Sequence, residues 1–413
     1  MPHSTDAHDS PAAKALEEWK SGQRETALDT LLPAASKGDD AALTLLVQLI
    51  GLPDAPALTA ELAQKAVEAA PASILRNRHR AYFRASGTGS APSWPAALAM
   101  RLDDAAEGDW QGRTELGLLA LLAGEEACGI AWLEEAARQG SGHAIAALLR
   151  LSIMRGAIRP AARDLGNGLA RSGHPLGQGL LSQCAGLPVD EAVFSGPVDP
   201  GETLAAIAAG IAPKPHGEQT LSDRPRIRQW DKALPAPLCD YLTVAAAPLL
   251  RPAEIINPRT GQMEADPYRS SLTAAIPEHV MDLVLWAVKS RMAALADRLP
   301  AHGEPISVIV YRPGEEYRAH FDFITGSQDT AGNGPGRRGQ RVATSLIRLN
   351  DEFRGGDTVF PRLDITWTGK SGSALSFDNV DADGKGDKRT LHAGKPVTEG
   401  VKVLASLWLR ERP

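Results

Sequence analysis

The chain has 413 residues, of which 43% are hydrophobic and 23% charged, and this balance excludes a globally disordered protein. Its net charge of −6 leaves no basic surplus for sequence-independent binding of nucleic acid. The three cysteines stand far apart without a Cys-x-x-Cys spacing, which argues against a disulfide scaffold and against a structural zinc site.

The N-terminal segment MPHSTDAHDSPAAKA contains no apolar stretch of the kind found in secretion signals. No apolar run approaches the roughly 20 residues that a membrane-spanning helix needs. Together with the sparse cysteines, these features predict a cytoplasmic protein without a membrane partner. The length predicts two or three domains.

A pair of small residues recurs through the first half of the chain. The pairs begin at positions 34, 69, 105, 136 and 169, and four of them are closely followed by Gly38, Gly108, Gly140 or Gly173. In between, apolar residues recur at the spacing of amphipathic helices. Small residues let two helices approach closely, and a glycine with positive φ ends a helix. The pattern therefore predicts an α-solenoid of stacked helical hairpins.

Residues 12–185 resemble the Sel1-like branch of tetratricopeptide repeats. The clearest unit reads TELGLLALLAGEEACGIAWLEEAARQGSGHAIAALL, and the third unit is interrupted by SGTGSAPSWP. The resemblance implies a concave face that holds a protein or peptide. The alternative is an alanine-rich helical bundle without a binding role.

Prolines and glycines are concentrated in residues 186–222, which predicts a connector that includes one short helix, ETLAAIAAG. Residues 223–413 are expected to form the last domain, and from Pro305 its pattern changes to strands, with the apolar runs PISVIVYR, RVATSLIRLN, GGDTVF, GSALSF and VKVLASLWLR. Residues 236–247 and 277–298 have helical spacing. Strands without interleaved helices predict an antiparallel sandwich or jelly roll with flanking helices. The whole chain is thus expected to be a multidomain α + β protein.

The segment YRPGEEYRAHFDF contains the pattern His-x-Asp at His320 and Asp322. Residues two apart on a strand face the same way, so these side chains are expected to point together. His392 is a third candidate. Two histidines and one carboxylate, with open positions left over, form the facial triad of non-haem Fe(II) oxygenases. His-x-Asp alone is a weak signal, and its weight here comes from the strand that follows His392.

That strand is VKVLASLWLR, and its alternation places on one face Lys402, Leu404, Ser406 and Trp408. Both faces are apolar enough for a buried strand. A buried lysine is costly unless an anion pairs with it, and a dicarboxylate cosubstrate would supply that anion. The alternative is a lysine that extends into solvent from the strand end.

These residues, in this order, resemble the prolyl 4-hydroxylase-like dioxygenases, which depend on Fe(II) and 2-oxoglutarate. The resemblance covers about residues 225–413 and includes the motifs Y.PG..Y..H.D, R.AT.L..LN and GGDT. It implies a double-stranded β-helix, a jelly-roll variant, in which His320, Asp322 and His392 bind Fe(II) and act as the catalytic centre. It further implies 2-oxoglutarate as cosubstrate, O2, and ascorbate as a candidate accessory cofactor.

The resemblance also implies the residues around the cosubstrate. It assigns the distal carboxylate of 2-oxoglutarate to Lys402, places Tyr311 in the same pocket and puts Trp408 near the metal. By alternation, Thr344 and Arg348 are expected on the face that lines this pocket.

Arg348 departs from the family, because most relatives have tyrosine at this position. A planar cationic side chain suits bidentate binding of a carboxylate, so we expect Arg348 to join Lys402 as a second cation for 2-oxoglutarate. The alternative is that Arg348 leaves the strand end and pairs with Asp351 or Glu352.

The function implied is hydroxylation of a peptide or protein substrate at prolyl residues. The helical repeats would recruit the substrate or mediate assembly. The glycine-rich segment 326–340, with its arginines, is expected to be either a plain surface loop or a loop that folds over a peptide. Two other functions stay open: an interaction scaffold whose oxygenase domain is a low-turnover, metal-bound sensor, and a hydroxylase of a small free amino acid.

Overall fold

The computed structural model describes residues 10–50, 52, 57–192, 194, 200–211, 214–256, 263–265, 269–325 and 338–413. The chain forms two compact units, Met1–Leu116 with Pro277–Trp286, and Gly117–Ile276 with Ala287–Pro413. The division falls inside two helices, α7 (Trp110–Ala123) and α14 (Leu283–Leu295). The domain boundaries expected from the sequence, 12–185, 186–222 and 223–413, stay a prediction.

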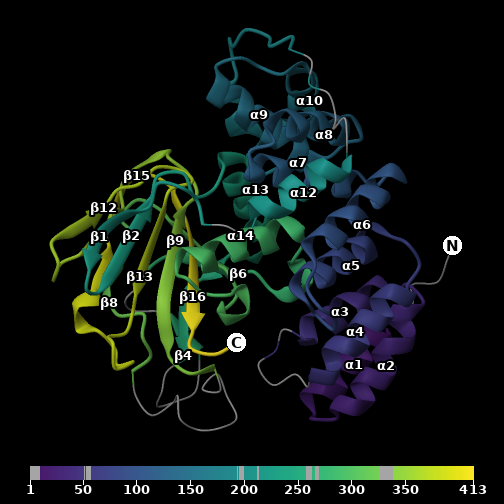
Figure 1. The fold of residues 1–413 in the computed structure, drawn as a ribbon, viewed down its shortest axis with the longest axis horizontal. Helices are drawn as coiled ribbons and strands as arrows, with labels where there is room; N and C mark the ends of the chain where they lie inside the picture. Colours follow the sequence, from purple (N-terminus) through teal and green to yellow (C-terminus); the bar gives the residue numbers. More distant parts are fainter. Residues whose placement is uncertain are drawn as a thin grey trace. The chain divides into compact units, whose positions relative to one another are not determined.

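Helices dominate the chain up to residue 211 (Figure 1). Besides α7, they are α1 (Pro11–Lys20), α2 (Arg24–Ser36), α3 (Asp40–Ile50), α4 (Ala57–Ala69), α5 (Ile74–Ser86), α6 (Trp94–Ala106), α8 (Glu126–Arg138), α9 (Gly142–Arg155), α10 (Pro160–Arg171), α11 (Gly177–Gln183) and α12 (Pro200–Ile211). Later in the chain, α13 (Ala236–Ala246) and α14 lie within the two segments expected to be helical. None of the described helices is both long and apolar enough to cross a bilayer.

Consecutive helices pack as hairpins, for example α1 on α2 and α5 on α6 in the first unit, and α8 on α9 in the second. Fully buried alanines such as Ala27 and Ala35 permit the close approach. Gly38 and Gly108 have φ values of +90° and +100°, which confirms that glycines follow the ends of α2 and α6 in the left-handed conformation. The hairpins are thus present, while their assignment to Sel1-like repeats stays a prediction.

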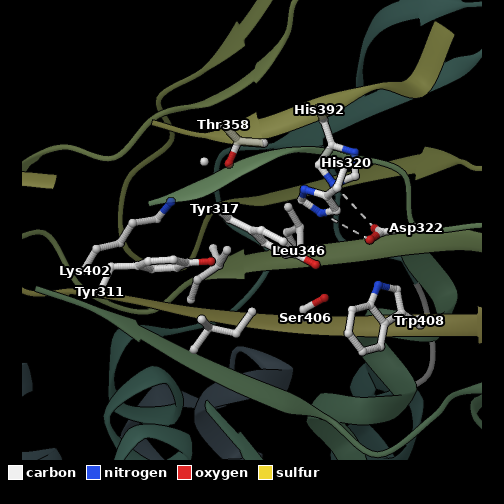
Figure 2. Close-up of a pocket in the computed structure, with 13 residues that line it drawn as sticks. Tyr311, Tyr317, His320, Asp322, Leu346, Thr358, His392, Lys402, Ser406 and Trp408 are labelled. Atoms are coloured by element: carbon white, nitrogen blue, oxygen red, sulfur yellow. Dashed lines mark ion pairs between the residues drawn. The ribbon is translucent and has the colours of Figure 1, made fainter. Parts of the chain in front are cut away.

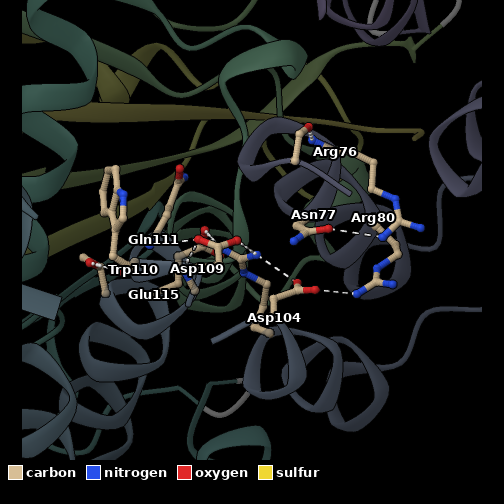
Figure 3. Close-up of polar contacts among 12 residues, drawn as sticks. Arg76, Asn77, Arg80, Asp104, Asp109, Trp110, Gln111 and Glu115 are labelled. Atoms are coloured by element: carbon tan, nitrogen blue, oxygen red, sulfur yellow. Dashed lines mark hydrogen bonds and ion pairs between the residues drawn. The ribbon is translucent and has the colours of Figure 1, made fainter. Parts of the chain in front are cut away.

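A cluster of ion pairs joins helices α5, α6 and α7 of the first unit, and Figure 3 labels its members Arg80, Asp104, Asp109 and Glu115. Arg101 on α6 donates at 3.0 Å to each of three carboxylates, those of Asp104, Asp109 and Glu115. The other oxygen of Asp104 accepts from Arg80 on α5 at 2.7 Å. Burial raises the pKa of Glu115 to about 7, although Arg101 acts in the opposite direction. Because Arg101 and its three carboxylate partners are buried, their pairing fixes how the helices meet.

The β-structure belongs to the second unit. Its described residues form an antiparallel eight-stranded sheet in the order β1-β2-β13-β9-β16-β7-β6-β3 and a four-stranded sheet in the order β12-β11-β14-β8. The larger sheet contains β1 (Gln219–Asp223), β2 (Arg226–Trp230), β3 (Arg251–Pro252), β6 (Leu272–Ala275), β7 (Ser307–Tyr311), β9 (Arg341–Arg348), β13 (Ala374–Asp378) and β16 (Lys402–Arg410). The smaller one contains β8 (Tyr317–His320), β11 (Thr358–Phe360), β12 (Ile365–Trp367) and β14 (His392–Gly394). Two hairpin pairs complete the set, β4 (Glu254–Ile256) with β5 (Met263–Ala265), and β10 (Phe353–Gly355) with β15 (Val397–Gly400).

An apolar core lies between the two sheets. Leu346, Phe377 and Leu404 come from the larger sheet, and Phe360 and Trp367 come from the smaller one. Two antiparallel sheets facing each other across such a core form a jelly roll, which confirms the predicted fold of this part of the chain.

The last helical hairpins and the jelly roll belong to the same unit, and helix α9 packs against α13. Arg150 of α9 donates Nε and Nη2 to the carboxylate of Asp240 on α13, at 2.7 and 3.1 Å. Such bidentate, charge-assisted bonds fix both the distance between the two helices and their relative orientation. Helix α9 is therefore part of the support of the jelly roll.

Candidate active site

His320, Asp322 and His392 converge on one point in the structure (Figure 2). His320 ends β8, His392 begins the neighbouring β14, and the two residues pair directly across these strands. Asp322 follows β8, and its Oδ1 and Oδ2 lie 3.5 Å from Nε2 of His320 and 3.6 Å from Nε2 of His392. In the described part of the chain this is the only group of three or more potential metal ligands, with ligand atoms within 4.8 Å of one another.

Hydrogen bonds orient both imidazole rings. Nδ1 of His320 bonds the carbonyl of Arg318 at 2.7 Å, and Nδ1 of His392 bonds the carbonyl of Thr390 at 2.9 Å. A carbonyl only accepts, so each Nδ1 carries the proton and each Nε2 lone pair faces the common point. Burial lowers the pKa of His392 to about 4, which keeps this ring neutral.

The Asp322 carboxylate is buried, at 5% exposure. Burial by itself would raise its pKa, but the neighbouring imidazoles and the hydroxyl of Thr344 hold the pKa well below its ordinary value. The site thus combines two imidazole nitrogens with one carboxylate on one side of a shared point. This donor set fits Fe(II) bound with open positions.

A pocket extends from these three residues between the sheets. As alternation along β16 predicted, its lining includes Lys402, Leu404, Ser406 and Trp408. Figure 2 shows Lys402 and Tyr311 at the opposite end of the pocket from Asp322. A ligand with two anionic ends could therefore reach from the metal-ligand cluster to the lysine.

Lys402 is only 4% exposed, so it does not extend into solvent. Its Nζ donates to the carbonyl of Gly356 at 2.5 Å and lies 5.4 Å from the ring centroid of Tyr311. Burial, helped by the positive charge of Arg348, lowers the pKa of Lys402 to about 8, while Asp357 acts in the opposite direction. No salt bridge to Lys402 is found among the described residues, and an anionic ligand would supply the missing charge.

Arg348 is not among the residues that line the pocket, and its expected role as a second cation for 2-oxoglutarate stays a prediction. Its Nε donates to the carbonyl of Asn350 at 2.9 Å, its Nη1 donates to the carbonyl of Thr368 at 3.1 Å, and its Nη2 lies 3.3 Å from the carboxylate of Asp351. Arg348 is the last residue of β9, where alternation no longer constrains the side chain. The alternative pairing with Asp351 is the one observed.

Thr344 also lies outside the pocket lining, although it faces the same region. It is fully buried and donates its hydroxyl to Oδ2 of Asp322 at 2.7 Å. Trp408 lines the pocket at the metal-ligand end, with the guanidinium carbon of Arg341 at 3.8 Å from its ring centroid. The cosubstrate and metal roles assigned to Thr344 and Trp408 stay predictions.

Two residues that line the pocket, Tyr317 and Thr358, were not predicted from the sequence to be functional residues. Tyr317 stacks on His320 with ring centroids 3.5 Å apart, and Thr358 lines the pocket from β11. Both belong to motifs already recognised, Y.PG..Y..H.D and GGDT, which is the signal that points to them. Of the segment 326–340, residues 326–337 lie outside the described residues.

The sequence-family model that describes the 2OG-Fe(II) oxygenase superfamily matches residues 306–410 of this chain. Prolyl 4-hydroxylase 1 of Arabidopsis thaliana is 30% identical over 209 residues, which cover 47% of this chain and 72% of that protein. Prolyl 4-hydroxylase subunit alpha-1 of Mus musculus is 34% identical over 190 residues, which cover 46% of this chain and 35% of that subunit.

Among solved structures, the viral collagen prolyl hydroxylase from Paramecium Bursaria Chlorella virus-1, in its 2OG complex, is similar to this chain. It has 25% sequence identity and a TM-score of 0.35, and the match covers 45% of this chain and 95% of that chain. The present chain spans only about a third of the length of the mouse subunit, 35%.

Proposed function

Because the chain belongs to the prolyl 4-hydroxylase family of 2-oxoglutarate- and Fe(II)-dependent oxygenases, we propose that it is a dioxygenase that hydroxylates prolyl residues of a peptide or protein. The observation that carries the proposal is one pocket with two chemically distinct ends. His320, Asp322 and His392 converge at one end, and the buried cation of Lys402 lies at the other.

In this proposal the three ligands hold Fe(II), and bound Fe(II) with 2-oxoglutarate and O2 supplies the oxidising chemistry. Lys402 binds the distal carboxylate of 2-oxoglutarate with its protonated amine, and Tyr311 lines the pocket beside it. The apolar side chains of Ile309, Leu346 and Leu404 exclude water from the pocket between the two ends. Tyr317, stacked on His320, keeps that ring in its orientation.

The peptide substrate and its recruitment by the helical hairpins are part of the same proposal. A peptide-binding role for the hairpins agrees with their resemblance to tetratricopeptide-type repeats. The packing of α9 on α13 gives the hairpins of the second unit a fixed connection to the catalytic fold. A cytoplasmic location stays a prediction from the sequence.

The test is release of succinate from 2-oxoglutarate by the full chain with Fe(II), measured with a panel of proline-containing peptides and with free proline. We expect turnover that needs iron and is stimulated by one or more peptides. His392→Ala should abolish it, because methyl cannot replace an imidazole ligand.

Other outcomes would contradict the proposal in distinct ways. Stimulation by free proline alone would indicate a hydroxylase of an amino acid. Tight iron and 2-oxoglutarate binding without turnover on any peptide would indicate a metal-bound sensor.

A further inference from the structure

A chain of two buried hydrogen bonds leads from strand β9 and the end of strand β13 to the metal-ligand carboxylate. The side-chain amide Nδ2 of Asn379 donates to Oγ1 of Thr344 at 2.9 Å. The hydroxyl of Thr344 donates to Oδ2 of Asp322 at 2.7 Å. Asn379 and Thr344 are fully buried, and Asp322 is 5% exposed. Water therefore does not compete for these bonds.

The direction of the chain follows from the chemistry of its members. An ionised carboxylate only accepts, so the hydroxyl of Thr344 must donate to Asp322. The oxygen of Thr344 is then free to accept, and the amide NH2 of Asn379 is the donor that meets it. This fixes which way the Asn379 amide points.

The far end of the chain is held by the backbone. Asn379 directly follows β13, its backbone N–H donates to the carbonyl of Val342 at 2.9 Å, and its own carbonyl accepts from Asp387 at 2.9 Å. Thr344 lies on β9, opposite Phe377 of β13. Both members are thus positioned by strands of the larger sheet, whereas Asp322 lies beyond the end of β8 and has no strand of its own to hold it.

We propose that Thr344 and Asn379 are positioning residues that fix the orientation of the Asp322 carboxylate. The hydroxyl of Thr344 occupies one of the two lone pairs of Oδ2, so this bond would disfavour binding of a metal through both carboxylate oxygens relative to binding through one. A carboxylate that binds through both oxygens would take a further coordination position. Holding it to one oxygen keeps that position open for 2-oxoglutarate or O2.

The inference rests on the proposed metal site but not on turnover, so Co(II) can serve as the probe. Co(II) affinity and the visible absorption spectrum of the bound ion are measured for the full chain and its variants. Thr344→Val, which removes the hydroxyl at nearly constant shape, should weaken Co(II) binding by about 10–100-fold, the usual effect of losing an outer partner of a metal ligand. It should also change the spectrum. Thr344→Ser should restore both.

Asn379 acts through Thr344, so its effects should not add to those of Thr344. Asn379→Ala should weaken Co(II) binding less than Thr344→Val does, and the double variant should be no weaker than Thr344→Val alone. Independent, additive losses in the double variant would overturn the relay.

The matched control is Ser345→Ala. Ser345 is the next residue of β9, fully buried, and its hydroxyl bonds Ser376 at 3.4 Å and not Asp322. This variant should keep the Co(II) affinity and spectrum of the parent. An equal loss in Ser345→Ala, or parental binding in Thr344→Val, would overturn the proposal. Failure of prolyl hydroxylation alone would leave these results interpretable, because Co(II) binding needs no substrate.

Discussion

At the scale of single residues, the charge of Lys402 sets how the pocket responds to pH. Burial and the nearby Arg348 lower its pKa to about 8, and the protonated form is the one that attracts a carboxylate. Affinity for 2-oxoglutarate should therefore stay constant at pH values below 8 and fall as the pH rises above 8, by up to about tenfold per unit. Calorimetric titration of the Co(II)-loaded chain with 2-oxoglutarate measures this.

Lys402→Met is the control for that titration. Without the ammonium, binding should be weak at every pH and should lose the fall above pH 8. If the same fall persisted in Lys402→Met, another group would be responsible and Lys402 would not be the partner of the carboxylate.

Arg348 provides a second prediction at this scale. Its guanidinium pairs with Asp351 outside the pocket, so Arg348→Ala should weaken 2-oxoglutarate binding far less than Lys402→Met does. Because Arg348 lowers the pKa of Lys402, its removal should also move the fall in affinity to higher pH. The same calorimetric titration checks both effects. A loss as large as that in Lys402→Met would restore the pocket role first expected for Arg348.

Alternation along a strand predicted which side chains of β16 line the pocket, because a buried strand constrains every residue within it. Alternation did not predict the contacts of the Arg348 side chain, which ends β9 opposite Leu404 and pairs with Asp351. It also could not identify Asp322 as the partner of Thr344, since Asp322 lies beyond the end of β8 and its position depends on how the two sheets face each other.

At the scale of elements, the strands within apolar runs were predictable, and the two short strands that carry the histidines were not. The runs that contain β7, β9, β11, β13 and β16 stand out in the sequence because most of their residues are buried. Strands β8 and β14 have four and three residues and carry the two histidines. Their pairing, His320 opposite His392, exists only in the folded sheet. The pairing of the two histidines therefore could not be predicted from the strands, and His392 was recognised from the order of the motifs.

The buried ion pairs of helix α6 lead to a stability prediction. Arg101→Met would leave the carboxylates of Asp109 and Glu115 buried without their cation. Removing one partner of a buried pair costs about 3–5 kcal/mol, so the first unit should unfold at much lower urea concentration. Circular dichroism of the helices during urea denaturation measures the effect.

Lys20→Met is the matched control for Arg101→Met in the same unit. Lys20 and Glu17 form an ion pair at 2.9 Å, but their side chains are 60% and 73% exposed. An exposed pair contributes about 0–1 kcal/mol, so this variant should unfold nearly as the parent does. Equal behaviour of the two variants would contradict a structural role for the Arg101 cluster.

At the scale of the whole molecule, some of the helical hairpins belong to the same unit as the catalytic jelly roll, and helix α9 packs against its helix α13. A fragment of residues 220–413 contains every residue of the candidate site, so it should still bind Co(II) and 2-oxoglutarate. It lacks α9, and Asp240 then loses its partner Arg150. We expect its melting temperature to fall by about 5 °C or more relative to the second unit in the full chain. An unchanged melting temperature would show that α9 gives the jelly roll no support.

Prolyl hydroxylation by this chain is tested most directly by following both oxygen atoms of isotopically heavy O2. The full chain with Fe(II) and 2-oxoglutarate is incubated with a library of proline-containing peptides, and mass spectrometry locates the heavy oxygen. We predict one heavy atom in succinate and one on a prolyl residue of a peptide, in equal amounts, and neither with Asp322→Ala. Succinate that forms without labelled peptide, or peptide oxygen that comes from water, would contradict a prolyl hydroxylase.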